Sequence, residues 1–94
     1  MMNEMDKLIS ICEAFKRGEF GVRGFQEYIE TVYLPNDCKH TLERFQHNAH
    51  NQLEKIIYFY GEDDLERANN VADQLIRATK VEQERLGMAI PYAV

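Results

Sequence analysis

The sequence predicts an all-α fold, an antiparallel four-helix bundle formed by a single domain over residues 1–94. Three observations support this fold class. Apolar residues recur every three or four positions in four segments, short turns separate these segments, and the alternation typical of strands is missing. The expected helices cover approximately 3–17, 22–34, 37–60 and 64–86, and an apolar C-terminal tail follows at 88–94.

The first two helices are bounded by capping and stop residues. Asn3 is expected to cap the first helix, and Gly18 follows its end. The second helix is expected to start at Val22 and to end before Pro35, because a residue that precedes proline avoids the helical conformation. Helical spacing assigns each helix a buried face, formed by Met5, Leu8, Cys12 and Phe15 in the first and by Val22, Phe25, Ile29 and Val32 in the second.

The third helix, 37–60, has the clearest pattern, and Asn36 or Asp37 is expected to cap it. Steps of three and four residues place one apolar set on a single face, which is expected to be buried. This set comprises Cys38, Leu42, Phe45, Ala49, Leu53, Ile56 and Tyr60. The opposite, polar face carries His40, Glu43, Arg44, His47, His50, Asn51, Glu54 and Tyr58. One helix is therefore expected to supply both part of the core and a candidate functional surface.

The fourth helix is expected to follow a turn at 61–64, with Asp63 or Asp64 as its N-cap and Gly87 as its stop. Its inner face is expected to bury aliphatic and small side chains. These are Leu65, Ala68, Ala72, Leu75, Ile76 and Thr79. The short connections between all four helices favour an up-and-down order in the bundle.

The charge balance restricts the classes of partner. The chain has 16 acidic and 11 basic residues, a net charge of −5, and no lysine or arginine cluster that would neutralise a phosphate backbone. We therefore expect no direct nucleic-acid binding, and a basic protein is the favoured partner. The apolar run at 56–60 is too short to cross a membrane, and the first ten residues lack the pattern of a signal peptide. A cytoplasmic protein without membrane association is expected.

Four carboxylates gather at the start of the fourth helix, on Glu62, Asp63, Asp64 and Glu66. A helix start needs only one or two acidic residues, each of which contributes about 0.3–1 kcal/mol. The surplus indicates either capping and solubility alone or a docking surface for a basic partner. Tyr58 lies one turn earlier and is a candidate binding anchor, unless a loop or the C-terminal tail covers it.

A second candidate set lies on the polar face of the third helix, on Glu43, His47, His50 and Glu54. Spacings of three and four make these side chains neighbours, and imidazole and carboxylate groups are ligands for Zn²⁺ or non-haem iron. The set is expected to face solvent without the outer hydrogen-bonding partners that metal ligands need. A solvated or partner-binding surface that includes His47, His50 and Glu54 is therefore preferred, and no metal or other cofactor is expected.

The sequence gives no indication of catalysis. No serine or cysteine lies in a glycine-flanked turn that would present a nucleophile. The glycines at 18, 21 and 24 match neither a phosphate-binding loop nor a dinucleotide-binding motif. We therefore expect that the protein is not an enzyme.

The first third of the chain resembles a family of small helical proteins. The resemblance lies in Leu8-Ile9 through Phe15, in Gly18-Glu19-Phe20 and in the stretch 25–29, Phe-Gln-Glu-Tyr-Ile. These segments are similar to those of the immunity proteins that bacteria make against colicin-type and contact-delivered toxins, including the colicin D immunity-like group. The resemblance implies a protein that binds a toxic domain, commonly a basic nuclease, with acidic side chains in place of nucleic-acid phosphates.

The leading hypothesis is a non-catalytic binding module that neutralises a cognate basic bacterial toxin. Two alternatives stay open. One is a metal-binding helical protein that uses the histidine and glutamate set of the third helix. The other is a regulatory homodimer, in which 88–94, or Ile57 and Phe59, would be buried against a second copy.

Overall fold

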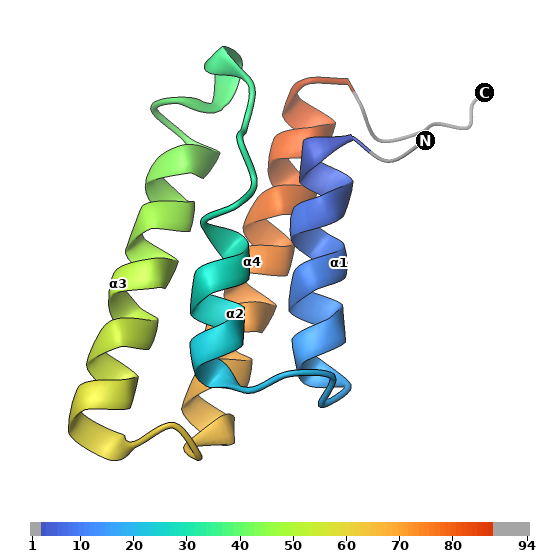
Figure 1. Ribbon diagram of the computed structural model, residues 1–94. Helices are drawn as coiled ribbons and strands as arrows, with labels where there is room; N and C mark the ends of the chain where they lie inside the picture. The colour runs from blue at the N-terminus through green and yellow to red at the C-terminus, as the bar shows by residue number, and fades with distance from the viewer. Residues whose placement is uncertain (1–2, 88–94) are drawn as a thin grey trace.

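The computed structural model describes residues 3–87, and the predicted all-α bundle is confirmed there (Figure 1). Its elements are α1 (Glu4–Lys16), α2 (Val22–Ile29), the short 3₁₀ helix η1 (Asn36–Cys38), α3 (Leu42–Tyr60) and α4 (Leu65–Arg85). Successive α-helices run in opposite directions, and α1 and α3 each pack against both α2 and α4 (Figure 1). The predicted apolar tail at 88–94 lies outside the described residues. Within residues 3–87, no helix combines the length and apolar character needed to cross a membrane.

The predicted bounds of α1 and α4 are confirmed because side chains fix their starts. The Asn3 Oδ1 atom accepts a hydrogen bond from the backbone N–H of Asp6 at 2.7 Å. The Asp64 Oδ1 atom accepts one from the backbone N–H of Arg67 at 3.2 Å. In each helix the side chain thereby satisfies one of the amides that lack a partner in the first turn. The predicted inner face of α1 is fully buried.

The second helix ends five residues earlier than the predicted end at residue 34. Its expected inner residues are buried, but Val32 follows the helix and does not belong to it. The Gln46 side chain of α3 donates hydrogen bonds to the carbonyl oxygens of Ile29 at 2.5 Å and Val32 at 3.0 Å. Because these carbonyls accept from α3, the chain leaves the helical path after Ile29 and still buries Val32.

The third helix begins at Leu42, so the predicted start at residue 37 and the predicted caps Asn36 and Asp37 are wrong. These residues belong to η1, and Cys38 is buried from η1 instead of α3. The hydroxyl of Thr41, which precedes α3, donates to the carboxylate of Glu82 on α4 and does not cap α3. A tertiary contact has therefore replaced the local cap that the sequence predicts.

The buried face of α3 also differs from the prediction. Phe45 and Tyr60 were expected in the core but are 41% and 55% exposed, and Gln46 is buried in their place. Burial of Gln46 is possible because its amide has two backbone acceptors on the far side of the core. Leu65, expected on the inner face of α4, is also exposed. The actual α3 core face consists of Leu42, Gln46, Ala49, Leu53 and Ile56.

One hydrophobic cluster fills the space between the helices, and both cysteines belong to it as free thiols. Burial, with the nearby Glu13 carboxylate, raises the pKa of Cys12 to about 12. Burial and a hydrogen bond to Glu82 raise the pKa of Cys38 to about 11. At neutral pH both side chains are therefore protonated and pack as small hydrophobic groups.

Candidate functional site

The turn between α3 and α4 exposes an unusual set of aromatic side chains at one end of the bundle. Tyr58, Phe59 and Tyr60 close α3, and all three are exposed, Tyr58 at 80%. The Tyr58 and Phe59 rings meet edge to face, with centroids 4.9 Å apart. Leu65, the first residue of α4, adds a fourth exposed apolar side chain. We call residues 58–66, which include the acidic turn, the α3–α4 corner.

The turn itself is built by Gly61 and Asp64. Gly61 has a φ of +97°, a backbone conformation that side-chain-bearing residues rarely adopt. Asp64 then caps α4, and its second carboxylate oxygen lies 3.1 Å from the Arg67 Nη1 atom. The Arg67 guanidinium also stacks over the Tyr60 ring, 3.8 Å from its centroid. Arg67 therefore neutralises one carboxylate of the corner and holds one of its aromatic rings in place.

Of the four carboxylates predicted to form one surface, two are paired with arginine side chains. Glu62 is 3.4 Å from the Arg23 guanidinium of α2, and Asp64 is paired with Arg67. Within residues 3–87, neither Asp63 nor Glu66 makes an ion pair, and both are exposed. The negative charge that the corner offers to a partner is therefore concentrated on Asp63 and Glu66.

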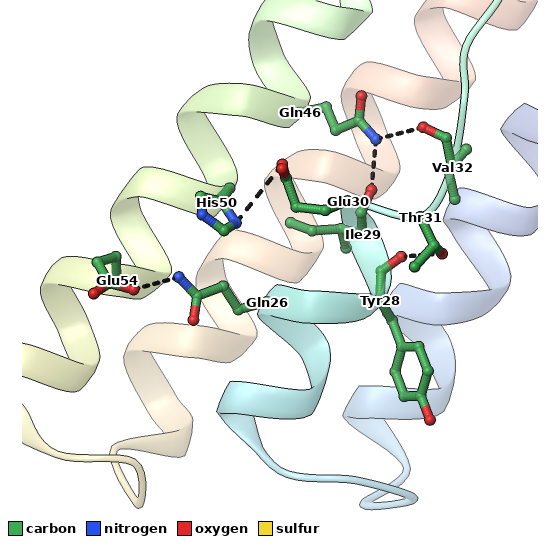
Figure 2. A network of polar contacts seen from close by, with 9 residues as sticks. All are labelled: Gln26, Tyr28, Ile29, Glu30, Thr31, Val32, Gln46, His50 and Glu54. Atoms are coloured by element: carbon green, nitrogen blue, oxygen red, sulfur yellow. Dashed lines mark hydrogen bonds and ion pairs between the residues drawn. The ribbon is translucent and has the colours of Figure 1, made fainter.

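The predicted histidine and glutamate stripe of α3 lies along the seam with α2. His50 Nδ1 is 3.6 Å from a carboxylate oxygen of Glu30, and the Gln26 amide donates to Glu54 Oε1 at 2.6 Å (Figure 2). The expectation of a fully solvated stripe is thus wrong for His50, which is half-buried, although His47 is exposed. Tyr58 lies one helical turn beyond Glu54, so the stripe leads into the corner.

The side chains of the stripe are divided among separate contacts in the part of the chain described. There, no group of three or more histidine, cysteine, aspartate or glutamate side chains is arranged so that it could hold a metal ion. His50 contacts Glu30, the residue that follows α2, and Glu54 contacts Gln26 of α2. Glu43 and His47 line a small surface cavity of about 170 Å³ with Tyr33. The stripe therefore supplies contacts between α2 and α3, and its last member, Glu54, lies one helical turn from the corner.

A buried ionic cluster at the other end of α4 was not predicted. Glu82 is 5% exposed, and Arg85 donates two hydrogen bonds to its carboxylate at 2.8 and 2.9 Å. Arg85 also donates to the backbone carbonyl of Asp37 at 3.0 Å, and the Thr41 hydroxyl donates to Glu82. The hydrogen bonds from Arg85, Thr41 and Cys38 outweigh burial and hold the pKa of Glu82 at about 2, below its usual 4.5. We call these residues the Glu82 cluster.

The sequence contained a signal for these buried polar residues. In α4, the buried positions Ala68, Ala72, Leu75 and Thr79 are followed at the next helical step by Glu82. In α3, Gln46 falls at the helical step between Leu42 and Ala49. The predictions missed both because they assigned no charged or amide side chain to a buried position. Similarly, three consecutive aromatic residues span about 200° of a helix, so they do not all face the core.

Comparison of the chain with protein-family models, with curated proteins and with solved structures gave no match.

Proposed function

We propose that the protein is a non-catalytic binding module that neutralises a cognate basic bacterial toxin, and that it docks this partner through the α3–α4 corner. The observation that carries the proposal is the exposure of three consecutive aromatic residues at the end of α3, Tyr58, Phe59 and Tyr60, followed closely in the chain by exposed carboxylates. These carboxylates belong to Asp63 and Glu66, which make no ion pair within residues 3–87. The resemblance of residues 8–29 to immunity proteins supports a toxin as the partner.

The aromatic side chains would supply most of the binding energy. Tyr58 and Phe59 are large and conformationally simple, and their edge-to-face contact already limits their freedom before binding. Removal of such an anchor from the centre of an interface typically costs at least 2 kcal/mol of binding free energy. We therefore assign Tyr58 the role of central anchor.

The free carboxylates would act mainly on the rate of association. Asp63 and Glu66 are exposed, so solvent screens their contribution to affinity. Their field still attracts a basic surface during diffusional encounter, an effect that is strongest at low salt. Glu62 and Asp64 contribute less because Arg23 and Arg67 already balance them.

The first test is affinity capture from the native host with the tag at the N-terminus, followed by mass spectrometry. We expect a basic toxin domain at equal stoichiometry. Binding of that domain is then compared for Tyr58→Ala and for Tyr33→Ala, a matched control because Tyr33 is 83% exposed but lies outside the corner. We expect Tyr58→Ala to raise Kd at least about 30-fold, mainly through faster dissociation, and Tyr33→Ala to leave Kd unchanged.

Charge reversal tests the steering role separately. The variant with Asp63→Lys and Glu66→Lys is expected to associate at least about tenfold more slowly at low salt, and the difference should shrink at high salt. Glu84→Lys reverses one charge at the other end of α4 and serves as the control. If both corner variants bind the captured domain like the wild type, the corner is not the interface.

The same exposed side chains support a second candidate, a regulatory homodimer closed through Phe59. A self-association through the corner would also bury the aromatic patch, but it would bring the Asp63 and Glu66 carboxylates of two copies close together. Light scattering over a dilution series distinguishes the two functions. A mass that stays at one chain at every concentration excludes the homodimer, whereas a concentration-dependent dimer that Phe59→Ala abolishes establishes it.

A further inference from the structure

A furrow runs along the outside of the bundle between α3 and α4. It consists of two adjoining hollows of about 540 and 280 Å³, and Gln74 lines both of them. The larger hollow lies near the start of α3, and the smaller one ends at Tyr60 and Arg67, beside the corner. From Arg67 to Val81 the furrow follows about 21 Å of α4, at 1.5 Å per residue.

The floor of the furrow is apolar, and parts of it are open to solvent. Leu42, Phe45, Ala78 and Val81 line the larger hollow, and Val81 is 65% exposed. Phe45, which the sequence pattern placed in the core, is 41% exposed and lines this opening. An apolar channel between two helices has the shape that accepts one further helix.

The charged side chains of the furrow are predominantly basic. Arg77 lines the larger hollow, and Lys55 and Arg67 line the smaller one. Within residues 3–87, Lys55 and Arg77 make no ion pair, and Glu82, the acidic residue of the lining, is already bound by Arg85. The furrow therefore offers positive charge on a chain whose net charge is −5.

We propose that this furrow binds one amphipathic α-helix of a partner protein, with apolar residues on its floor and Asp or Glu residues along its rim. The charge complementarity selects an acidic helix. It opposes a two-fold dimer through the same face, which would bring the basic rims of two copies together. The proposal goes beyond the proposed function, because the corner takes a basic surface and the furrow takes an acidic one.

The test uses two fluorescein-labelled synthetic helical peptides of 18 residues. Both carry leucine and alanine on one face, and the other positions hold glutamate in one peptide and lysine in the other. Fluorescence anisotropy with the full chain is expected to show that the glutamate peptide binds at least tenfold more tightly than the lysine peptide at low salt. Equal or undetectable binding of the two peptides overturns the proposal.

Variants then locate the bound peptide. Val81→Glu is expected to lower the affinity for the glutamate peptide at least tenfold. The double variant Lys55→Glu and Arg77→Glu is expected to bind the lysine peptide more tightly than the glutamate peptide. Leu65→Glu, which changes an exposed apolar residue of the corner, serves as the matched control and should leave peptide binding unchanged. Thermal unfolding confirms that each variant is folded, which is expected because Val81, Lys55 and Arg77 are exposed.

The remaining outcomes separate this proposal from other occupants and from the proposed function. Tyr58→Ala should not alter peptide binding, so failure of the furrow and failure of the corner are independent results. Binding that occurs only in a chain ending at Gly87 would assign the furrow to residues 88–94 and overturn the proposal. A dimer that the Val81→Glu substitution abolishes would assign it to a second copy, with the same consequence.

Discussion

The two ends of α4 carry the same kind of ion pair in different surroundings. At the start, Asp64 pairs with Arg67, and at the end, Glu82 pairs with Arg85, in each case three residues later in the chain. The Asp64 side chain is partly open to solvent, whereas that of Glu82 is almost completely buried. Sequence spacing alone makes the pairs equivalent, but burial gives them separate roles.

The difference lies in what each pair contacts outside its own helix. Asp64 caps α4, and Arg67 stacks on Tyr60, so the first pair orders the exposed corner. Glu82 and Arg85 reach Thr41 and the carbonyl of Asp37, so the second pair fastens the connection between α2 and α3 to α4. An exposed pair contributes up to about 1 kcal/mol, whereas breaking a buried one costs several. One pair therefore orders an exposed turn, and the other maintains the fold.

The largest loss of stability is expected for Glu82→Ala. This substitution leaves Arg85, Thr41 and Cys38 without their shared acceptor, so we expect a loss of about 3 kcal/mol in the free energy of unfolding. The value lies at the lower end of the range because Arg85 is half-exposed and regains water. Urea unfolding followed by circular dichroism measures the effect, with Glu84→Ala as an exposed control expected within about 0.5 kcal/mol of wild type. Equal losses in the two variants would remove the distinction between the ends of α4.

The second prediction concerns the stability of the folded protein at acidic pH. Because folding lowers the pKa of Glu82 from 4.5 to about 2, the cluster stabilises the protein fully above about pH 4.5 and loses this contribution as the pH falls toward 2. The stability advantage of wild type over Glu82→Gln should therefore shrink by roughly 2 kcal/mol between pH 6 and pH 3, at 1.36 kcal/mol per pKa unit. Denaturant titrations of both proteins at the two pH values measure this change. An advantage that does not depend on pH would show that folding does not lower the pKa of Glu82.

The smallest expected effect is at the exposed pair. Asp64→Ala removes the cap of α4 and the partner of Arg67, and we expect a loss of about 1 kcal/mol in the free energy of unfolding. Asp63→Ala, one residue earlier and without an ion pair in the described chain, should change stability by less than about 0.5 kcal/mol. The same denaturant titrations compare the two variants. A loss at Asp64 as large as that at Glu82 would contradict the role assigned to burial.

The parts of the fold that were predictable are those fixed by local chemistry. Asn3 and Asp64 are capping residues in the sequence and in the structure, so the starts of α1 and α4 followed from the sequence. The region between α2 and α3 did not, because its backbone is shaped by side chains distant in the sequence, Gln46 and Glu82. A polar residue at a core position can be buried when it has a hydrogen-bond partner across the core. The spacing of residues in the sequence does not show which group is that partner.

The candidate site was also predictable only where it depends on residues close in the sequence. Tyr58 and the acidic turn were identifiable as neighbours because they are close in the sequence. The sequence did not reveal which carboxylates are free, since the partner of Glu62 is Arg23, on another helix and 39 residues away. Likewise, the sequence did not reveal the furrow, because Phe45 and Tyr60, which line it, were expected in the core and are exposed.

The contact of Thr41 with Glu82 has a further consequence for local motion. Among the described residues, no side chain caps α3, so the amides of its first turn lack the side-chain acceptor that Asp64 provides for α4. The first hydrogen bond of α3 runs from the Phe45 amide to the carbonyl oxygen of Thr41 at 3.2 Å, and Thr41 is attached to Glu82 on α4. Local opening of the Glu82 cluster would therefore expose the Phe45 amide to hydrogen exchange while the rest of the bundle stays closed. The first turn of α3 thus reports, as an exchange rate, on an ion pair located in a different helix.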